Sequence, residues 1–134
     1  MLRSVLAILA GFLSMMVLVM PFTVITARVM LGTRTREDMM KTPPTPAYVN
    51  LNLLFSGLAA VLGGFVAGRV ATHVPLGHAA VLATFMAVFG FVSWRVDIEK
   101  KTAEGRRFGG TLVVLGPVCA LIGGWLASSL NAAL

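Results

Sequence analysis

The sequence predicts an all-α, polytopic membrane protein whose four transmembrane helices form an antiparallel bundle. The composition is 57% hydrophobic with 12% charged residues and a mean hydropathy of +0.90, about half the charge of a typical soluble domain. The 11 basic and 5 acidic residues leave four long uncharged windows, and a helix needs about 20 residues to cross a bilayer. A charge at the bilayer centre costs roughly 2.5–3.5 kcal/mol, so these windows mark the spans.

The windows predict a single membrane domain, 1–134, with helices at about 4–28, 47–70, 76–95 and 109–132. The first apolar run is too long for a secretory signal, so we expect it to be retained as a helix. It contains Pro21, which removes a backbone hydrogen bond and predicts a kink. Pro75 follows a short link after the second helix and suits the first turn of the third.

Two basic loops, about 29–46 and 96–108, connect the first helix to the second and the third helix to the fourth. The first loop contains Thr35-Arg36-Glu37-Asp38, a capping pattern that predicts one helical turn. Thr42-Pro43-Pro44-Thr45-Pro46 then predicts an extended segment that leads into the second helix.

The charges of these loops orient the chain. Nine basic residues fall in or beside them: Arg28, Arg34, Arg36, Lys41, Arg95, Lys100, Lys101, Arg106 and Arg107. The opposite side carries only Arg3 and Arg69. Because basic loops stay in the cytoplasm, we expect a multi-pass protein of the bacterial inner (plasma) membrane with both termini outside. The same loops suit anionic headgroups, so the expected partner is the lipid bilayer and not nucleic acid.

The second and fourth predicted helices resemble each other. Ala59-Ala60-Val61-Leu62-Gly63-Gly64-Phe65-Val66-Ala67-Gly68 matches Cys119-Ala120-Leu121-Ile122-Gly123-Gly124-Trp125-Leu126-Ala127-Ser128 in identity or size at each position. The match fits two parallel hairpins related by an axis along the membrane normal. It fits equally well two small-residue helices that converged on one packing pattern.

Small residues recur along these two helices at every fourth position. The candidate packing residues are Ser56, Ala60, Gly63, Gly64 and Gly68, and Gly116, Ala120, Gly123, Gly124 and Ser128. In lipid no hydrophobic force joins helices, and small residues allow the close backbone approach that does. One ridge would close the bundle while another meets a partner or a second copy; the alternative is packing within one chain alone.

Residues that carry chemistry are sparse. His73 and His78 are the only histidines and are the candidate cofactor-binding residues, because an imidazole near a membrane surface can hold haem iron or zinc. No cysteine or carboxylate lies nearby to complete a zinc site, so we expect no metal. No base lies at membrane depth to activate a serine, so no catalytic residue is assigned and we expect no enzyme.

The surplus of packing ridges and the absence of chemistry favour a small accessory or structural subunit that packs against other transmembrane helices of a larger complex. The alternative is a homo-oligomeric transporter or channel for a small neutral or lipophilic solute, with the repeated helices lining the path. A haem-binding membrane subunit is a minor third hypothesis, which a visible absorption spectrum tests.

Four short motifs follow one another along the chain. They are Ala-Gly-Phe-Leu in the first helix, Pro-Thr-Pro-Ala-Tyr and Leu-Gly-Gly-Phe-Val-Ala-Gly-Arg in the second, and Gly-Gly-Trp-Leu in the fourth. This order resembles that of small uncharacterised four-helix bacterial inner-membrane proteins. That group has no assigned activity, so the resemblance implies a fold and assigns no functional residue.

Overall fold

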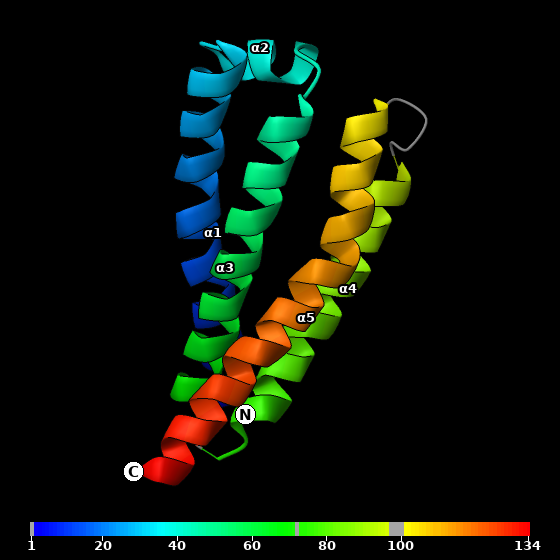
Figure 1. Cartoon of the computed structure of the whole chain (residues 1–134). Helices are drawn as coiled ribbons and strands as arrows, with labels where there is room; N and C mark the ends of the chain where they lie inside the picture. Colours follow the sequence, from blue (N-terminus) through cyan, green and yellow to red (C-terminus); the bar gives the residue numbers. More distant parts are fainter. Residues whose placement is uncertain (1, 72, 97–100) are drawn as a thin grey trace.

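The structure, a computed structural model, describes residues 2–71, 73–96 and 101–134. Most of these residues lie in five helices (Figure 1): α1 Leu2–Leu31, α2 Arg36–Lys41, α3 Pro46–Val70, α4 Pro75–Val96 and α5 Ala103–Ala133. The helices α1, α3, α4 and α5 are each long and apolar enough to cross a membrane. The predicted all-α class and its four membrane-length helices are confirmed.

The predicted cap forms at the start of α2. The Thr35 hydroxyl accepts a hydrogen bond from the Asp38 amide at 3.1 Å, and the Asp38 carboxylate accepts one from the Thr35 amide at 3.1 Å. These bonds hold the pKa of Asp38 below its ordinary value of 3.8. Thr42 and Thr45 are extended, and Thr45 caps α3 by accepting a hydrogen bond from the Tyr48 amide at 3.3 Å.

Two helices extend beyond the uncharged windows. The helix α1 continues through Pro21 and Arg28 and ends at Gly32, whose φ of 67° suits a glycine C-cap. The helix α5 begins at Ala103, ahead of the predicted start at 109, because the Thr102 hydroxyl accepts a hydrogen bond from the Gly105 amide at 3.2 Å. Of the predicted loop 96–108, residues 97–100, including Lys100, lie outside the described residues.

Figure 1 shows the long helices in two pairs, α1 with α3 and α4 with α5. The end of the molecule that holds α2, the last turn of α4 and the first turn of α5 is called the loop end below. Both ends of the chain lie at the opposite end, called the terminus end. The two pairs lie close together near the terminus end and diverge towards the loop end.

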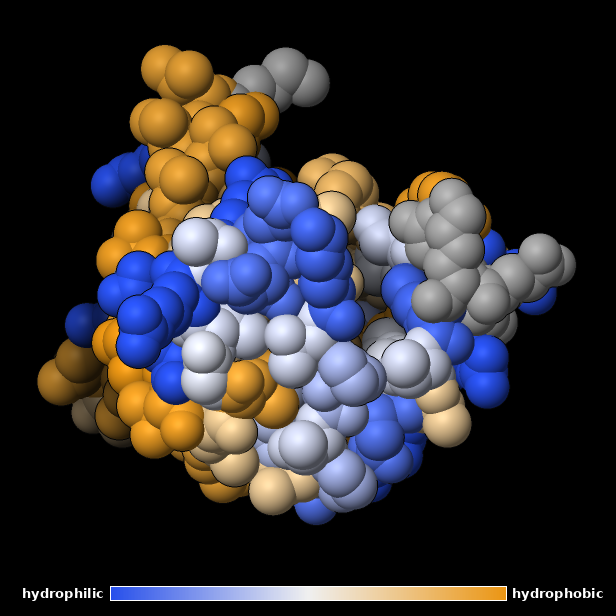
Figure 2. Space-filling view, turned by 90° about the horizontal axis from the view of Figure 1, so that it is seen from above, coloured by the Kyte–Doolittle hydropathy of each residue, from blue (hydrophilic) through white to orange (hydrophobic). Residues whose placement is uncertain are grey.

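The helix α3 lies at the centre of the packing. Its main contacts are with α1 and α5, and α5 in turn packs on α4, while smaller contacts join α4 to α3 and to α1. The main contacts thus follow the order α1–α3–α5–α4. Arginine–asparagine hydrogen bonds join α3 to α5 near both ends: Arg107 Nη2 donates to Asn50 Oδ1 at 3.0 Å, and Arg69 Nη1 donates to Asn131 Oδ1 at 2.6 Å. Seen from the loop end, hydrophilic residues cover much of the face and hydrophobic residues flank it (Figure 2).

Candidate functional site

Close backbone contacts join α1, α3 and α5 in the half of the molecule towards the terminus end. A Cβ added at Gly11 of α1 would lie 2.5 Å from the carbonyl oxygen of Gly63. A Cβ added at Gly64 would overlap the carbonyl group of Ala120 on α5. Real Cβ atoms do not approach other atoms this closely, so α1 and α5 can lie against α3 only because these positions are glycine.

The adjacent glycines of α5 face different neighbours from the glycines that they match in sequence. A Cβ at Gly123 would overlap the carbonyl group of Val61 on α3, and one at Gly124 would overlap Ala79 on α4. On α3, Gly63 faces α1 and Gly64 faces α5. On α5, the matching Gly123 faces α3 and Gly124 faces α4. If the hairpin of α1 and α3 were related by an axis to the hairpin of α4 and α5, Gly123 would face α4 and Gly124 would face α3. The structure therefore does not confirm the symmetric repeat.

The other predicted packing residues lie in or beside the same helix contacts. Ala60 and Ala120 are fully buried, Ser56 is 9% exposed, Gly68 adjoins Ala127 and Pro75, Gly116 adjoins Met86, and Ser128 is half-buried. The second ridge of α3, Ala59, Gly63 and Ala67, is buried as well. The residues of both small-residue ridges of α3 are therefore largely buried by helices of this chain.

The two histidines lie in different surroundings, one in a connection between helices and the other in the first turn of a helix. His73 is exposed in the connection between α3 and α4. His78 lies in the first turn of α4, where its Nδ1 is 2.8 Å from the carbonyl oxygen of Val74. Among the described residues no group of three His, Cys, Asp or Glu side chains gathers in a way that could hold a metal ion.

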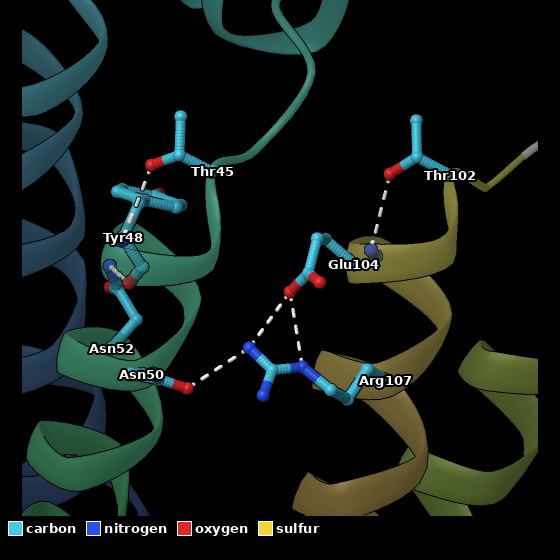
Figure 3. A network of polar contacts seen from close by, with 8 residues as sticks. Thr45, Tyr48, Asn50, Asn52, Thr102, Glu104 and Arg107 are labelled. Carbon is cyan, nitrogen blue, oxygen red and sulfur yellow. Dashed lines mark hydrogen bonds and ion pairs between the residues drawn. The ribbon is translucent and has the colours of Figure 1, made fainter.

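A buried polar cluster joins α1 to α3 towards the loop end. Asn52 is 3% exposed; its Oδ1 accepts a hydrogen bond from the Thr23 hydroxyl at 3.3 Å, and its Nδ2 donates to the carbonyl of Tyr48 at 3.0 Å and to the Thr26 hydroxyl at 3.4 Å. A buried amide is stable only when its hydrogen-bonding groups are engaged in this way. Figure 3 shows Asn52 on the side of α3 towards α1, and Asn50 on the side towards α5.

Arg107 spans the space between α5 and α3 where the two helix pairs diverge. Its guanidinium donates from Nε to the Glu104 carboxylate at 3.0 Å and from Nη2 to Asn50 at 3.0 Å (Figure 3). The charge is thus held between a carboxylate and an amide at the loop end. This long side chain therefore connects α5 to α3 where the two helix backbones are not in close contact.

An apolar hollow of about 230 Å³, the central cleft, lies between α1 and α4 about midway along the helices. Its lining residues are Phe12, Met15, Met16, Val19, Ser56, Phe85, Met86, Phe89, Gly90 and Leu112. Phe85 meets Phe12 edge to face and stacks on Phe89, each with ring centroids 6.0 Å apart. Because Phe85 and Phe89 are 53% and 63% exposed, the cleft opens on the side of the molecule where lipid would lie.

A second hollow of about 220 Å³, the loop-end pocket, lies beneath α2. Its lining residues are Thr23, Ala27, Leu31, Met39, Thr42, Pro44, Tyr48, Val49, Asn52, Gly105 and Phe108. On three helices these residues stand one turn from residues of the central cleft: Thr23 from Val19, Asn52 from Ser56, and Phe108 from Leu112. One turn rises about 5.4 Å, so at these positions the two hollows lie about one turn apart along the helices.

The chemistry of the central cleft is that of a lipophilic binding site. Among the described residues that line it, Ser56 supplies the only hydroxyl and none is titratable, so these residues provide no base that would activate a nucleophile. No role was predicted from sequence for its phenylalanines and methionines. The spacing of Phe12, Met15, Met16 and Val19 in one helix, and of Phe85, Met86 and Phe89 in another, is the signal that could have identified a shared helix face.

Comparisons with known proteins provide no further assignment. The predicted resemblance to small bacterial inner-membrane proteins gains no support from them, and the geometry described above carries the functional argument. A scan against protein-family models gave no match, and searches of curated proteins and of solved structures found no match either.

Proposed function

We propose that the chain spans the bacterial inner membrane four times as an antiparallel bundle, with the loop end in the cytoplasm and both termini outside. The basic residues of the α1–α3 and α4–α5 connections gather at the loop end, whereas Arg3 and Arg69 belong to the other side. Positive loops are retained in the cytoplasm, and this charge asymmetry supports the orientation.

Within the membrane, the proposed function is to bind a lipophilic solute in the central cleft and, as part of a homo-oligomer, to pass it through the bilayer. The observation that carries this proposal is that the helices pack tightly towards the terminus end and loosely towards the loop end. Glycine contacts close the half towards the terminus end, whereas the central cleft and the loop-end pocket leave the other half hollow. A site at membrane depth that is closed towards one side and open towards the other is characteristic of transport proteins.

An accessory subunit of a larger membrane complex is the second candidate. Phe85 and Phe89, which line the mouth of the central cleft on α4, form a stacked aromatic pair and are 53% and 63% exposed. Aromatic side chains are enriched at protein interfaces, so this surface favours a partner. In a pull-down from native membranes, partners at a constant ratio would support the accessory subunit. The protein alone, or one defined homo-oligomer, would support solute binding.

Filling the central cleft is expected to abolish solute binding. The probe is a long-chain alcohol with a photoreactive diazirine at the end of its chain, applied to the protein in phosphatidylcholine nanodiscs. In the unchanged protein the labels should map to α1 and α4 around the cleft. The variant Ser56→Leu places an isobutyl group in the cleft and should lower labelling by about tenfold, which corresponds to about 1.4 kcal/mol.

Ser129→Leu is the matched control, because Ser129 is exposed on α5 away from the cleft, and its labelling should equal that of the unchanged protein. Gly90→Leu is a second cleft-filling variant. A Cβ at Gly90 would lie 3.6 Å from Val113, an ordinary contact distance, so the first carbon of the new side chain is accommodated, and circular dichroism checks that the variant is folded. Unchanged labelling in both cleft variants, or labels spread evenly over all four helices, would contradict the proposal.

A further inference from the structure

A third hollow, the vestibule, lies at the surface of the loop end beside the loop-end pocket. Its volume is about 350 Å³, and it lies between α2 with the following segment 42–44 and the start of α5. It shares Met39, Thr42, Pro44 and Gly105 with the loop-end pocket, so the two hollows adjoin. These two hollows, together with the central cleft one turn further along α1, α3 and α5, are called the series below.

The lining of this series includes two lysines in the vestibule, mixes polar with apolar side chains in the loop-end pocket, and is almost wholly apolar in the central cleft. Lys41 and Lys101 line the vestibule. Thr23 and Asn52 line the loop-end pocket, where they are hydrogen-bonded to each other at 3.3 Å. Phenylalanine and methionine dominate the central cleft. Such a gradient matches a molecule with a charged head and a hydrocarbon tail, because each part meets the surroundings in which its transfer from water or lipid costs least.

The vestibule favours an anionic head. Nine basic residues and all five acidic residues of the chain fall in or beside the two loops 29–46 and 96–108, so the net charge of the loop end is positive. Lys101 Nζ donates to the carbonyl of Ser93 at 3.2 Å, and Lys41 pairs with Glu37 at 2.5 Å. Lys41 and Lys101 are the charged residues among those lining the vestibule, and a lysine ammonium binds an anion as a point charge.

We infer that this series holds a single-chain amphiphile with a carboxylate head, taken from the leaflet at the loop end. The carboxylate lies in the vestibule near Lys101, and the chain runs through the loop-end pocket into the central cleft. The inference rests on the proposed function, because it names the class of solute that the central cleft takes. The loop-end pocket, at about 220 Å³, is smaller than the roughly 300–1,000 Å³ of drug-sized sites and suits one chain.

The test compares two probes of equal chain length, palmitate and hexadecanol, each with a terminal diazirine, on the whole protein in phosphatidylcholine nanodiscs. Palmitate is expected to label the central cleft about tenfold more strongly than hexadecanol, with a preference that decreases as salt rises. Lys101→Gln should remove most of this preference, and Lys41→Gln combined with Lys101→Gln should remove all of it. Arg34→Gln, which removes a loop-end charge outside the vestibule lining, should preserve it.

The outcomes separate this inference from the function on which it rests. Equal labelling of the cleft by palmitate and hexadecanol would overturn the carboxylate site and leave the lipophilic site standing. A palmitate preference that survives the double lysine change would also overturn the carboxylate site. The absence of cleft labelling by either probe, in protein whose circular dichroism shows a folded state, would overturn both proposals.

Discussion

Replacing Gly64 with alanine is expected to destabilise the folded protein by about 1–3 kcal/mol, the usual cost of overpacking a tight interior. The new methyl group would overlap the backbone carbonyl of Ala120. A carbonyl held within a helix cannot turn aside as the end of a flexible side chain can, so α3 and α5 must separate. A reversible unfolding titration in mixed micelles, followed by circular dichroism, measures the change.

Gly90→Ala is the matched control for this prediction, since it is the same substitution within a helix of the same chain. A Cβ at Gly90 meets Val113 at the ordinary distance of 3.6 Å, and alanine favours a helix over glycine by roughly 0.5–1 kcal/mol. The control should therefore be neutral or slightly stabilising. Equal stability of Gly64→Ala and Gly90→Ala would contradict the close α3–α5 contact.

A cysteine at the C-terminus is expected to react with a membrane-impermeant maleimide outside intact cells, whereas a cysteine in α2 is expected to be protected. Suitable variants are Leu134→Cys and Met40→Cys in a Cys119→Ser background, because Leu134 and Met40 are 96% and 81% exposed. The expected difference is all or none, since the basic loop end stays in the cytoplasm. Permeabilising the cells should make Met40→Cys react fully.

The reversed labelling pattern would show that the loop end faces outwards, which would contradict the orientation. Labelling of both cysteines from outside would indicate a mixture of orientations. The unequal distribution of basic residues between the two sides argues against that mixture, because dual insertion requires a near balance of loop charges.

The uncharged windows predicted how many membrane-length helices form but not where each helix ends. Charges avoid the hydrocarbon layer, so an uncharged window gives the length of the segment inside the membrane. The helix itself can continue beyond that segment. The helix α5 therefore begins at Ala103, within a charged segment, because Thr102 provides a cap there. Local signals that depend on a few adjacent residues, such as the Thr35 and Asp38 cap, were predicted correctly from sequence.

The candidate site was less predictable, because it depends on how helices face one another. Gly63 and Gly64 both belong to small-residue ridges in the sequence, but one faces α1 and the other α5. Consecutive residues of a helix with 3.6 residues per turn point about 100° apart, and only the packed structure decides which neighbour each one meets. The central cleft arises because the helix pairs diverge, a property for which the sequence has no local signal.

The most direct test of the one-sided opening compares two cysteines that stand one turn apart on α3. Ser56 lines the central cleft, whereas Ala60 is fully buried towards the glycine contacts. In folded protein lacking Cys119, a lipid-soluble maleimide is predicted to modify Ser56→Cys, at a position 9% exposed in the lining of the cleft, faster than Ala60→Cys, at a position 0% exposed. Equal reactivity of the two cysteines in the folded protein would contradict a cleft that is open at Ser56 and closed at Ala60.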